Sequence, residues 1–367
     1  MINYIYPSIE VNGRAILLDN ICNGQHSPTS EFEASLFDFV RQWIDGGDGF
    51  ELMTSGSTGD PKRITITRTQ IIASAEATAS ALKLKRGMTS LLCLSPAYIA
   101  GKMMIVRSFV TGMQMVCVDP TSNPMDQLVQ RQIDFCAMVP MQVYHSARAE
   151  GNALKRIKKL IIGGGSLDSQ TFELLPKTKC ECYATYGMTE TISHIALKRL
   201  NGRKKTGFYS ALPGVALSLD ERGCLVIDWK ILGAPVKTND LVELVDSKTF
   251  DWLGRWDNII NSGGIKIIPE KLEEGVRSIL ESSGLTNRLI ICKVDDVRLG
   301  EKVILIIEGS ATTSSLVQVR LLMDNRLKRY ESPREILFCH QFIETATGKI
   351  NRTETLKHAL LTRNSSG

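Results

Sequence analysis

The strongest local signal in this sequence is Thr54-Ser55-Gly56-Ser57-Thr58-Gly59-Asp60-Pro61-Lys62. Its glycines let the backbone turn sharply and bring N–H groups close to a ligand. Four hydroxyl side chains and Lys62 surround the same point, and that combination suits a polyphosphate. The stretch is not a Walker A loop, because no Lys-Ser/Thr pair follows the last glycine at the required spacing. A flexible Ser/Gly turn is the alternative interpretation.

Strands and helices alternate around this loop. Apolar runs predict strands at residues 50–54, 91–94, 115–118, 135–139 and 160–162. Helical spacing or composition predicts helices at residues 31–44, 69–83, 101–110, 124–132 and 169–175. Thr29 or Ser30 is a candidate cap for the first of these helices. The alternation predicts an α/β fold with parallel layers.

The texture of the sequence changes after Gly214. Short alternating runs up to Val245 predict antiparallel β structure, and a smaller α+β unit follows Asp257. The elements predicted for this unit are helices at 269–281, 315–330 and within 345–361, and strands at 289–293 and 303–308. We therefore expect a large N-terminal α/β domain over residues 1–256, with a β subdomain, and a small C-terminal α+β domain over residues 257–367.

The composition is that of a soluble globular protein. Of 367 residues, 43% are hydrophobic and 23% are charged, and chains of this size usually form about two or three domains. The net charge of +5 is dispersed, and its basic runs carry no interleaved aromatics. We therefore expect solvated basic faces and no nucleic-acid partner. A basic excess suits anionic ligands, although weakly.

The N-terminus and the cysteines favour a cytoplasmic protein. The first ten residues lack the basic start of a signal peptide, and no uncharged apolar run approaches the ~20 residues of a membrane helix. The 9 cysteines show neither common zinc-site spacing nor a disulfide framework. We expect buried, reduced thiols and no membrane insertion.

Two further motifs stand where ligands of open α/β sheets bind. Gly163-Gly164-Gly165 directly follows a predicted strand, at the carboxyl edge of the sheet. In Tyr186-Gly187-Met188-Thr189-Glu190-Thr191, the aromatic ring could stack on a purine, Thr189 could bind a phosphate oxygen and Glu190 could hold Mg²⁺. Taken alone, the first motif is more often a plain turn, and the second could be a strand end with a cap.

Three later motifs contribute charged residues to the candidate ligand-binding residues. Asp240 is a natural acceptor for two ribose hydroxyls, and Arg255 follows 15 residues later. Lys349 stands behind a glycine in Thr345-Ala346-Thr347-Gly348-Lys349, where it can reach into a cleft as a point charge. Turns with ordinary surface charges are the alternative for each motif taken singly.

Taken together and in this order, the motifs resemble the adenylate-forming superfamily of acyl-CoA synthetases, firefly luciferases and peptide-synthetase adenylation domains. The matching stretches run from about residue 50 to residue 352. Within the superfamily, the chain looks most like the o-succinylbenzoate–CoA ligases of menaquinone biosynthesis. That second resemblance is carried by Val139-Pro140-Met141-Gln142, the Tyr186 motif followed by Ser193-His194-Ile195, and residues 258–269.

The resemblance implies a ligase that uses ATP, Mg²⁺ and CoA to turn a small carboxylic acid into an acyl-adenylate and then a CoA thioester. The residues implied in nucleotide binding are Thr54, Ser55, Gly56, Ser57, Thr58, Gly59 and Lys62 on the phosphates, and Gly163, Gly164 and Gly165 along the adenine and acyl pocket. Those implied beside them are Tyr186 on adenine, Thr189 on the α-phosphate, Glu190 on Mg²⁺, and Asp240 with Arg255 on the ribose.

The same resemblance implies a C-terminal lid that turns between two half-reactions. Asp257 would be the hinge of this lid, and Lys349 would be its adenylation lysine. Gly263 and Gly264 would border the channel through which CoA enters.

Four departures from the family pattern stand out. Only about fifty residues precede the phosphate loop, so we expect part of the usual N-terminal subdomain to be absent, exposing surface or favouring a homo-oligomer. Asn239 stands where the family usually has glycine before the ribose aspartate. Residues 96–101 replace a segment that normally offers a histidine, and Ile343 stands where a proline commonly precedes the lysine loop.

If the acid is o-succinylbenzoate, its second carboxylate needs a cationic partner. Lys102 and Arg107 lie on the helix predicted at 101–110, and His194 is a third candidate. We prefer Arg107, because it stands in an otherwise apolar stretch and an arginine there requires an anionic partner. An internal ion pair with Asp119 or a similar acid is the alternative for this residue.

Two other functions stay open. The chain could adenylate an acid for a carrier protein, although no carrier domain is fused to it. It could also be a non-catalytic sensor of AMP or acyl-CoA. The presence of Lys349 and Glu190 argues against a sensor, which has no use for adenylation chemistry.

Overall fold

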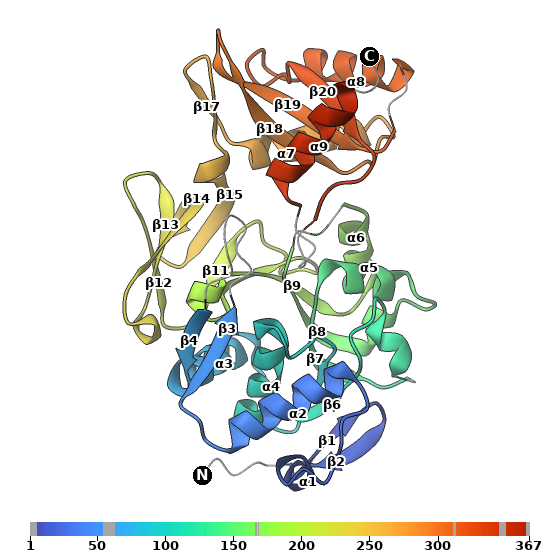
Figure 1. The fold of residues 1–367 in the computed structure, drawn as a ribbon, viewed down its shortest axis with the longest axis vertical. Coiled ribbons are helices and arrows are strands. Elements are labelled where there is room, and N and C mark those ends of the chain that lie inside the picture. Colours follow the sequence, from blue (N-terminus) through green and yellow to red (C-terminus); the bar gives the residue numbers. More distant parts are fainter. Residues whose placement is uncertain are drawn as a thin grey trace. The chain divides into compact units, whose positions relative to one another are not determined.

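The computed structural model describes residues 6–53, 63–128, 130–165, 167, 169–310, 313–344 and 350–364. The chain forms two compact units. The first comprises Met1–Leu217, Ile227–Val236 and Val245–Phe250, and the second comprises Ser218–Val226, Lys237–Leu244 and Asp251–Gly367. Figure 1 shows their helices and strands, with labels where there is room.

Five parallel strands form the centre of the first unit. They are β5 (Thr89–Leu92), β6 (Gln114–Cys117), β7 (Ile133–Met138), β8 (Ile157–Ile162) and β9 (Glu181–Gly187). Their order in the sheet is β6-β5-β7-β8-β9, so the direction of strand addition reverses between β5 and β7. Such a switch point, at the carboxyl ends of the strands, is where ligands of open α/β sheets bind.

Further strands extend this sheet. On one side β1 (Ser8–Val11) pairs in parallel with β6 and antiparallel with β2 (Arg14–Leu17). On the other, β9, β10 (His194–Arg199), β11 (Tyr209–Ala211) and β15 (Thr249–Arg255) pair antiparallel in that order. The order continues through β14 (Val236–Asp246), β13 (Cys224–Trp229) and β12 (Val215–Leu219), which form the β region predicted after Gly214.

Helices cover both faces of the central sheet. α3 (Arg68–Leu82) packs on α4 (Ile99–Thr111), and the Ser108 hydroxyl of α4 lies 2.7 Å from that of Ser90 in β5. The neighbouring Leu91 faces the other way, into a core that contains Val143 of α5 (Pro140–Arg148). Because successive strand side chains point to opposite faces, α4 and α5 lie on different faces. α6 (Ser169–Leu174) packs on α5.

The N-terminal helices support the strand pair that flanks residues 54–62. α1 (Leu18–Cys22) packs on α2 (Glu31–Ile44), whose N-cap is Ser30, with its hydroxyl 3.2 Å from the Glu33 N–H. The Trp43 ring of α2 stacks on Phe50, at 5.7 Å between ring centroids. Phe50 belongs to β3 (Gly49–Met53), which pairs antiparallel with β4 (Arg63–Thr67) on either side of the loop.

The second unit contains its own sheet. Its strands are β16 (Ile260–Ser262), β17 (Ile265–Ile267), β18 (Leu289–Asp296), β19 (Gly300–Glu308) and β20 (Glu335–Cys339), and β19 lies between β18 and β20. On one face of this sheet, α7 (Pro269–Glu281) and α8 (Thr313–Arg326) pack into a first core. On the opposite face, α9 (Arg352–Asn364) packs into a second core. Leu305 belongs to the first core and Ile306 to the second, as a strand buried on both faces requires.

One predicted helix was wrong. The described residues within 124–132 form only a 3-10 turn at Pro124–Gln127, because Leu128 is extended and Gln130 has a φ of 50°, which an α-helix excludes. Among the described residues, no helix is long and apolar enough to cross a membrane.

Candidate active site

The three glycines lie where β8 ends beside β7 and β9. A Cβ on Gly163 would stand 2.6 Å from the Thr185 hydroxyl, which itself donates to the carbonyl of Ile162 at 3.1 Å. Only glycine allows this close approach. A Cβ on Gly164, whose φ is +87°, would lie 3.3 Å from Val139, and one on Gly165 3.7 Å from Pro140. The glycines thus border the carboxyl edge of the sheet, as the sequence predicts.

The ring of Tyr186, at the end of β9, is held by two other aromatic rings. Its centroid lies 5.1 Å from that of Phe250 in an edge-on contact and 5.8 Å from that of Tyr209. Tyr209 and Phe250 stack on one another at 5.4 Å. Such pairs restrict the orientation of a ring. Tyr186 is half-buried, and its place beside the glycine edge suits a planar ligand.

The turn from β9 to β10 is strained. After the 3-10 turn Thr189–Thr191, Ile192 takes φ 71° and ψ −53°, and the Ser193 N–H donates to the Thr191 carbonyl at 2.7 Å. These values define a γ-turn of the rare form, which a β-branched residue seldom adopts. Backbone strain of about 1–3 kcal/mol is typical of such a site. The turn sets the positions of Ser193 and His194.

Thr189 and Glu190 precede this turn. Thr189 is half-buried, and the Glu190 carboxylate is exposed and forms no ion pair with another described residue. One exposed carboxylate suits Mg²⁺, which usually keeps several waters and takes its remaining oxygens from substrate phosphates.

Arg107 is a buried charge of the first unit that has no carboxylate partner among the described residues. Arg107 is 2% exposed. Its Nη2 donates to the Ser193 hydroxyl at 2.9 Å and lies 3.4 Å from Nδ1 of His194. Its Nε has no hydrogen-bond partner, and no described carboxylate forms an ion pair with it. Burial lowers the pKa of Arg107 to about 9. The predicted alternative partner, Asp119, instead contacts Asn12 and Ser30.

His194 is neutral and its tautomer follows from its neighbours. Burial first, and then the Arg107 charge, hold the pKa of His194 well below its usual range. The Thr78 hydroxyl donates to the Ser74 carbonyl at 3.1 Å, so it accepts from Nε2 of His194, 3.2 Å away. Nδ1 is then the acceptor that faces Arg107. The imidazole therefore neutralises none of the arginine charge.

Lys102 lies elsewhere on α4. Its ammonium is 5.6 Å from the centroid of the Phe39 ring of α2, and burial lowers its pKa. The structure therefore brings Arg107 and His194 together through Ser193, whereas the contact of Lys102 is with α2.

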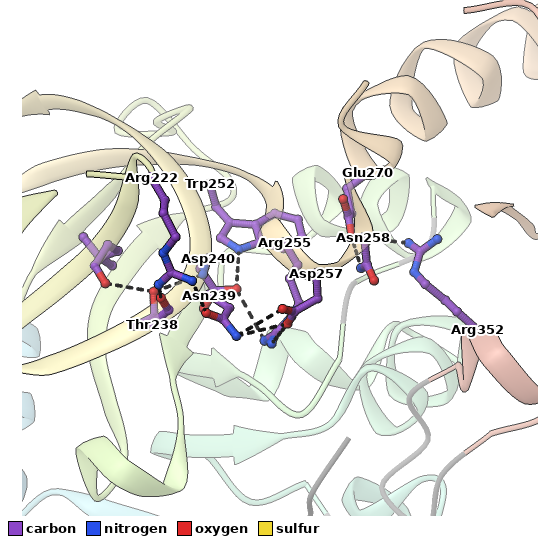
Figure 2. A network of polar contacts seen from close by, with 11 residues as sticks. Arg222, Thr238, Asn239, Asp240, Trp252, Arg255, Asp257, Asn258, Glu270 and Arg352 are labelled. Atoms are coloured by element: carbon purple, nitrogen blue, oxygen red, sulfur yellow. Dashed lines mark hydrogen bonds and ion pairs between the residues drawn. The ribbon is translucent and has the colours of Figure 1, made fainter. Parts of the chain in front are cut away.

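The predicted ribose residues belong to the second unit and contact one another (Figure 2). Asp240 is 6% exposed and accepts from Nε1 of Trp252 at 3.2 Å, and Nη1 of Arg255 lies 3.7 Å from the same oxygen. The Asp240 N–H donates to the Thr238 hydroxyl at 3.0 Å. Nη2 of Arg255 also reaches Asp257, at 2.9 Å.

Several predicted residues lie outside the described part of the chain: Thr54, Ser55, Gly56, Ser57, Thr58, Gly59, Lys62 and Lys349. The residues flanking Lys349 are described. Glu344 and Ile350 form a β-bridge, and the Asn351 N–H donates to the Ile343 carbonyl at 2.8 Å. Gly263 and Gly264 form the turn between β16 and β17, with φ of 60° and 82°.

Sequence reasoning missed Ser193, Thr78 and Trp252. No local pattern marks them. Packing between distant elements brings Ser193 and Thr78 to their partners, and pairing of the neighbouring strands β14 and β15 brings Trp252 to Asp240.

Comparisons with known proteins show what the chain is similar to. Residues 45–231 match the model of the AMP-binding enzyme family. A solved acyl-CoA synthetase (AMP-forming)/AMP-acid ligase II-like protein from Dyadobacter fermentans is 37% identical, with a TM-score of 0.62 over 92% of this chain and 97% of that one. The ATP- and magnesium-bound o-succinylbenzoate coenzyme A synthetase from Bacillus subtilis is 19% identical and has a TM-score of 0.68, covering 83% and 69%.

Curated relatives carry similar names. The 2-succinylbenzoate–CoA ligase of Salmonella typhimurium is 22% identical over 82% of this chain and 66% of its own length. The probable 2-succinylbenzoate–CoA ligase of Mycobacterium tuberculosis is 24% identical over 87% and 86%. With the glycine edge, the Tyr186 motif and the family match over half its length, the chain belongs to the AMP-binding enzyme family of the adenylate-forming superfamily.

Proposed function

We propose that the protein is an ATP-dependent acid–CoA ligase whose acid is o-succinylbenzoate or a closely similar aromatic diacid. Its membership in a family of AMP-forming ligases supports the reaction, and the names of several relatives suggest the acid. The single observation that carries the choice of acid is the buried guanidinium of Arg107, which lacks a carboxylate partner among the described residues.

A second carboxylate on the substrate would satisfy this arginine. A buried charge is strongly unfavourable unless it is paired and hydrogen-bonded. Nε of Arg107 is unpartnered, so a carboxylate oxygen could accept from it while the other accepts from an Nη nitrogen. The Ser193 hydroxyl accepts from Arg107, which leaves its own proton to donate to the same carboxylate. Burial and the Arg107 charge lower the pKa of His194, so the carboxylate would face the charge of Arg107 beside a neutral imidazole.

The nucleotide side of the proposal rests on the remaining residues. Tyr186 and the glycines Gly163 to Gly165 would hold adenine, and Asp240 with Arg255 would hold the ribose. Thr189 would contact the α-phosphate, and Glu190 would hold Mg²⁺, which supplies positive charge to the phosphates. Residues 54–59, Lys62 and Lys349 are proposed for the phosphates on the sequence pattern and the resemblance.

These residues act by position and charge. The acid attacks the α-phosphorus and pyrophosphate leaves, so the protein needs to align the two groups and neutralise negative charge. We propose that the lid comprises residues 257–367 and turns at Asp257 after this step. CoA would then enter beside Gly263 and Gly264, and its sulfur would attack the acyl carbonyl as AMP leaves. Exclusion of water protects the mixed anhydride.

The direct test supplies the protein with ATP, Mg²⁺ and CoA, and with o-succinylbenzoate, benzoate, acetate or a medium-chain fatty acid in separate reactions. Pyrophosphate and thioester are measured. We expect turnover with o-succinylbenzoate alone. Turnover with a different acid would keep the ligase and refute the diacid, whereas no pyrophosphate from any acid would refute the ligase and favour a carrier-protein system or a sensor.

Arg107→Met tests the carboxylate partner. Methionine fills similar space without a charge, and removing an uncompensated buried charge should leave the fold intact. We expect the KM for o-succinylbenzoate to rise about tenfold or more, since a hydrogen bond to a charged group contributes about 1.5–3 kcal/mol. The KM for ATP should change little.

Lys102→Met is the parallel variant, on the same helix. If it raises the KM for the diacid and Arg107→Met does not, Lys102 is the partner and the role of Arg107 fails. An unchanged KM in both variants would remove both candidates from the acid site.

A further inference from the structure

Asn239 links two charged groups of opposite sign. Its Nδ2 lies 3.2 Å from each carboxylate oxygen of Asp257, and its Oδ1 accepts from Nη1 of Arg222 at 2.9 Å (Figure 2). A guanidinium only donates and a carboxylate only accepts, so the two partners fix which way the amide faces. Asn239 therefore stands oriented between Arg222 and Asp257.

Arg222 is itself held from three sides. It forms an ion pair with Asp220 at 2.8 Å and donates to the Thr238 carbonyl at 3.0 Å. Its guanidinium also lies 5.8 Å from the ring centroid of Trp256. Three contacts leave the side chain little freedom, so the amide that it orients is also restrained.

The backbone at residue 239 does not demand a special residue. Its φ is not positive, so the conformation is open to any amino acid. A residue without a side-chain donor at this position could not reach Asp257, so the contact depends on the Asn239 amide.

Asn258, the residue after Asp257, makes its contact with α7 and not with β14. Asn258 donates to Glu270 of α7 at 2.5 Å, and the same carboxylate oxygen lies 3.8 Å from Arg352 at the start of α9 (Figure 2). Asp257 and Asn258 belong to a single 3-10 turn, Trp256–Asn258. Residue 257 therefore lies between a contact toward β14 and a contact toward α7 and α9.

We propose that Arg222 and Asn239 are positioning residues that hold Asp257 in its present conformation and so bias the two half-reactions. The three residues form a hinge latch. This inference rests on the proposed function, in which the lid turns at Asp257. Rotation about the N–Cα bond of Asp257 would carry its carboxylate away from the Asn239 amide, so a lid movement of that kind opens the latch.

The latch is tested at Asn239, because Asp257 also pairs with Arg255 of the ribose cluster. In Asn239→Gly and Asn239→Ala, adenylation is followed by ATP–pyrophosphate exchange. The second step is followed by single-turnover thioester formation from the preformed adenylate. We expect the ratio of the two rates to change by about threefold or more, a modest effect because the contact is partly exposed.

Two further variants complete the design. Arg222→Gln should shift the ratio in the same direction, and combining it with Asn239→Ala should add nothing, since both open one latch. Asn287→Ala is the matched control: Asn287 is an exposed asparagine of the same unit that makes one hydrogen bond, to the Glu308 carbonyl at 2.9 Å. It should leave the ratio unchanged.

The possible outcomes separate the two proposals. If the unaltered protein exchanges pyrophosphate and the Asn239 variants change both rates in parallel, or neither rate, the latch is refuted and the ligase stands. If the unaltered protein exchanges none with any acid, the proposed function fails and the latch fails with it. A changed ratio with an unchanged KM for ATP supports the latch.

Discussion

The absence of a side chain at Gly187 allows the end of β9 to pack closely against the start of β10. A Cβ there would lie 2.4 Å from the Cα of His194 and 2.4 Å from the carbonyl oxygen of Ser193. Both are backbone atoms, which cannot yield as a flexible side chain does. Gly187 therefore allows Ser193 to lie where it contacts Arg107, in addition to its place beside Tyr186.

Gly187→Ala is accordingly expected to destabilise the protein by about 1–3 kcal/mol, the usual range for overpacking. It should also raise the KM for the acid, because Ser193 and His194 move. Gly275→Ala is the control, and it should raise stability where Gly187→Ala lowers it. Gly275 is exposed in α7 with open space around it, and alanine in a helix interior gains up to about 1 kcal/mol. Denaturant unfolding of both variants measures the difference; a neutral Gly187→Ala would contradict the close approach.

His194 should make stability depend on pH. Its folded pKa lies well below its usual range, so the unfolded chain binds a proton from about pH 6.5 downward while the folded protein does not. Stability then falls as pH falls from about 7 toward 5, by at most about 1.4 kcal/mol per pH unit for one proton.

His194→Gln should flatten this slope, because glutamine does not titrate and can still donate to Thr78. Thermal midpoints between pH 7 and pH 5 give the comparison. His145→Gln, at an exposed position of α5, is the control and should keep the slope of the unaltered protein. Equal slopes in the His194 variant and the unaltered protein would show that His194 does not set the dependence.

At the scale of elements, Arg352 joins α9 to α7 and β18. Its guanidinium contacts both carboxylate oxygens of Glu273, one of them at 2.9 Å, and donates to the Ile291 carbonyl at 2.9 Å. Burial alone would lower the pKa of Arg352, but the hydrogen bond and charge of Glu273 outweigh it and raise the pKa. The start of α9, three residues after Lys349, is thereby tied to the body of the second unit.

Arg352→Met should therefore destabilise the second unit strongly, by about 3–5 kcal/mol, because the Glu273 carboxyl is left buried without its partner. The double variant Arg352→Met/Glu273→Leu should recover most of that loss, since no unpaired charge remains. Unfolding monitored by hydrogen exchange of β18 follows the unit directly. Equal stabilities of the single and double variants would mean that the ion pair contributes little.

Elements with strong start signals could be predicted to the residue. α2 and α7 begin and end where expected, because Ser30 caps one and Pro269 begins the other, before an apolar stripe. β4 and β10 were missed, since polar residues interrupt their apolar character. α5 was missed because Val143 and Ala147 give it only a narrow buried stripe.

For the molecule as a whole, the order of motifs predicted the family, but the contacts within the site could not be predicted. Gly163, Tyr186 and Asp240 lie at strand ends or on strands, where period and position are readable. The pairing of Arg107 with Ser193 depends on the γ-turn at Ile192, a conformation that no residue preference would assign to isoleucine. The latch likewise depends on the meeting of residues 18 apart in sequence, Asn239 and Asp257.

The sequence of β19, which is buried on both faces, also favours aggregation of the chain before it folds. Val303 to Ile307 are five consecutive apolar residues, rich in β-branched side chains. Such a run is typical of segments that associate between unfolded molecules. Glu301, Lys302 and Glu308 flank it, and charged gatekeepers in those positions oppose stacking of identical chains. The strand that gives the second unit its two cores thus carries its own protection against aggregation.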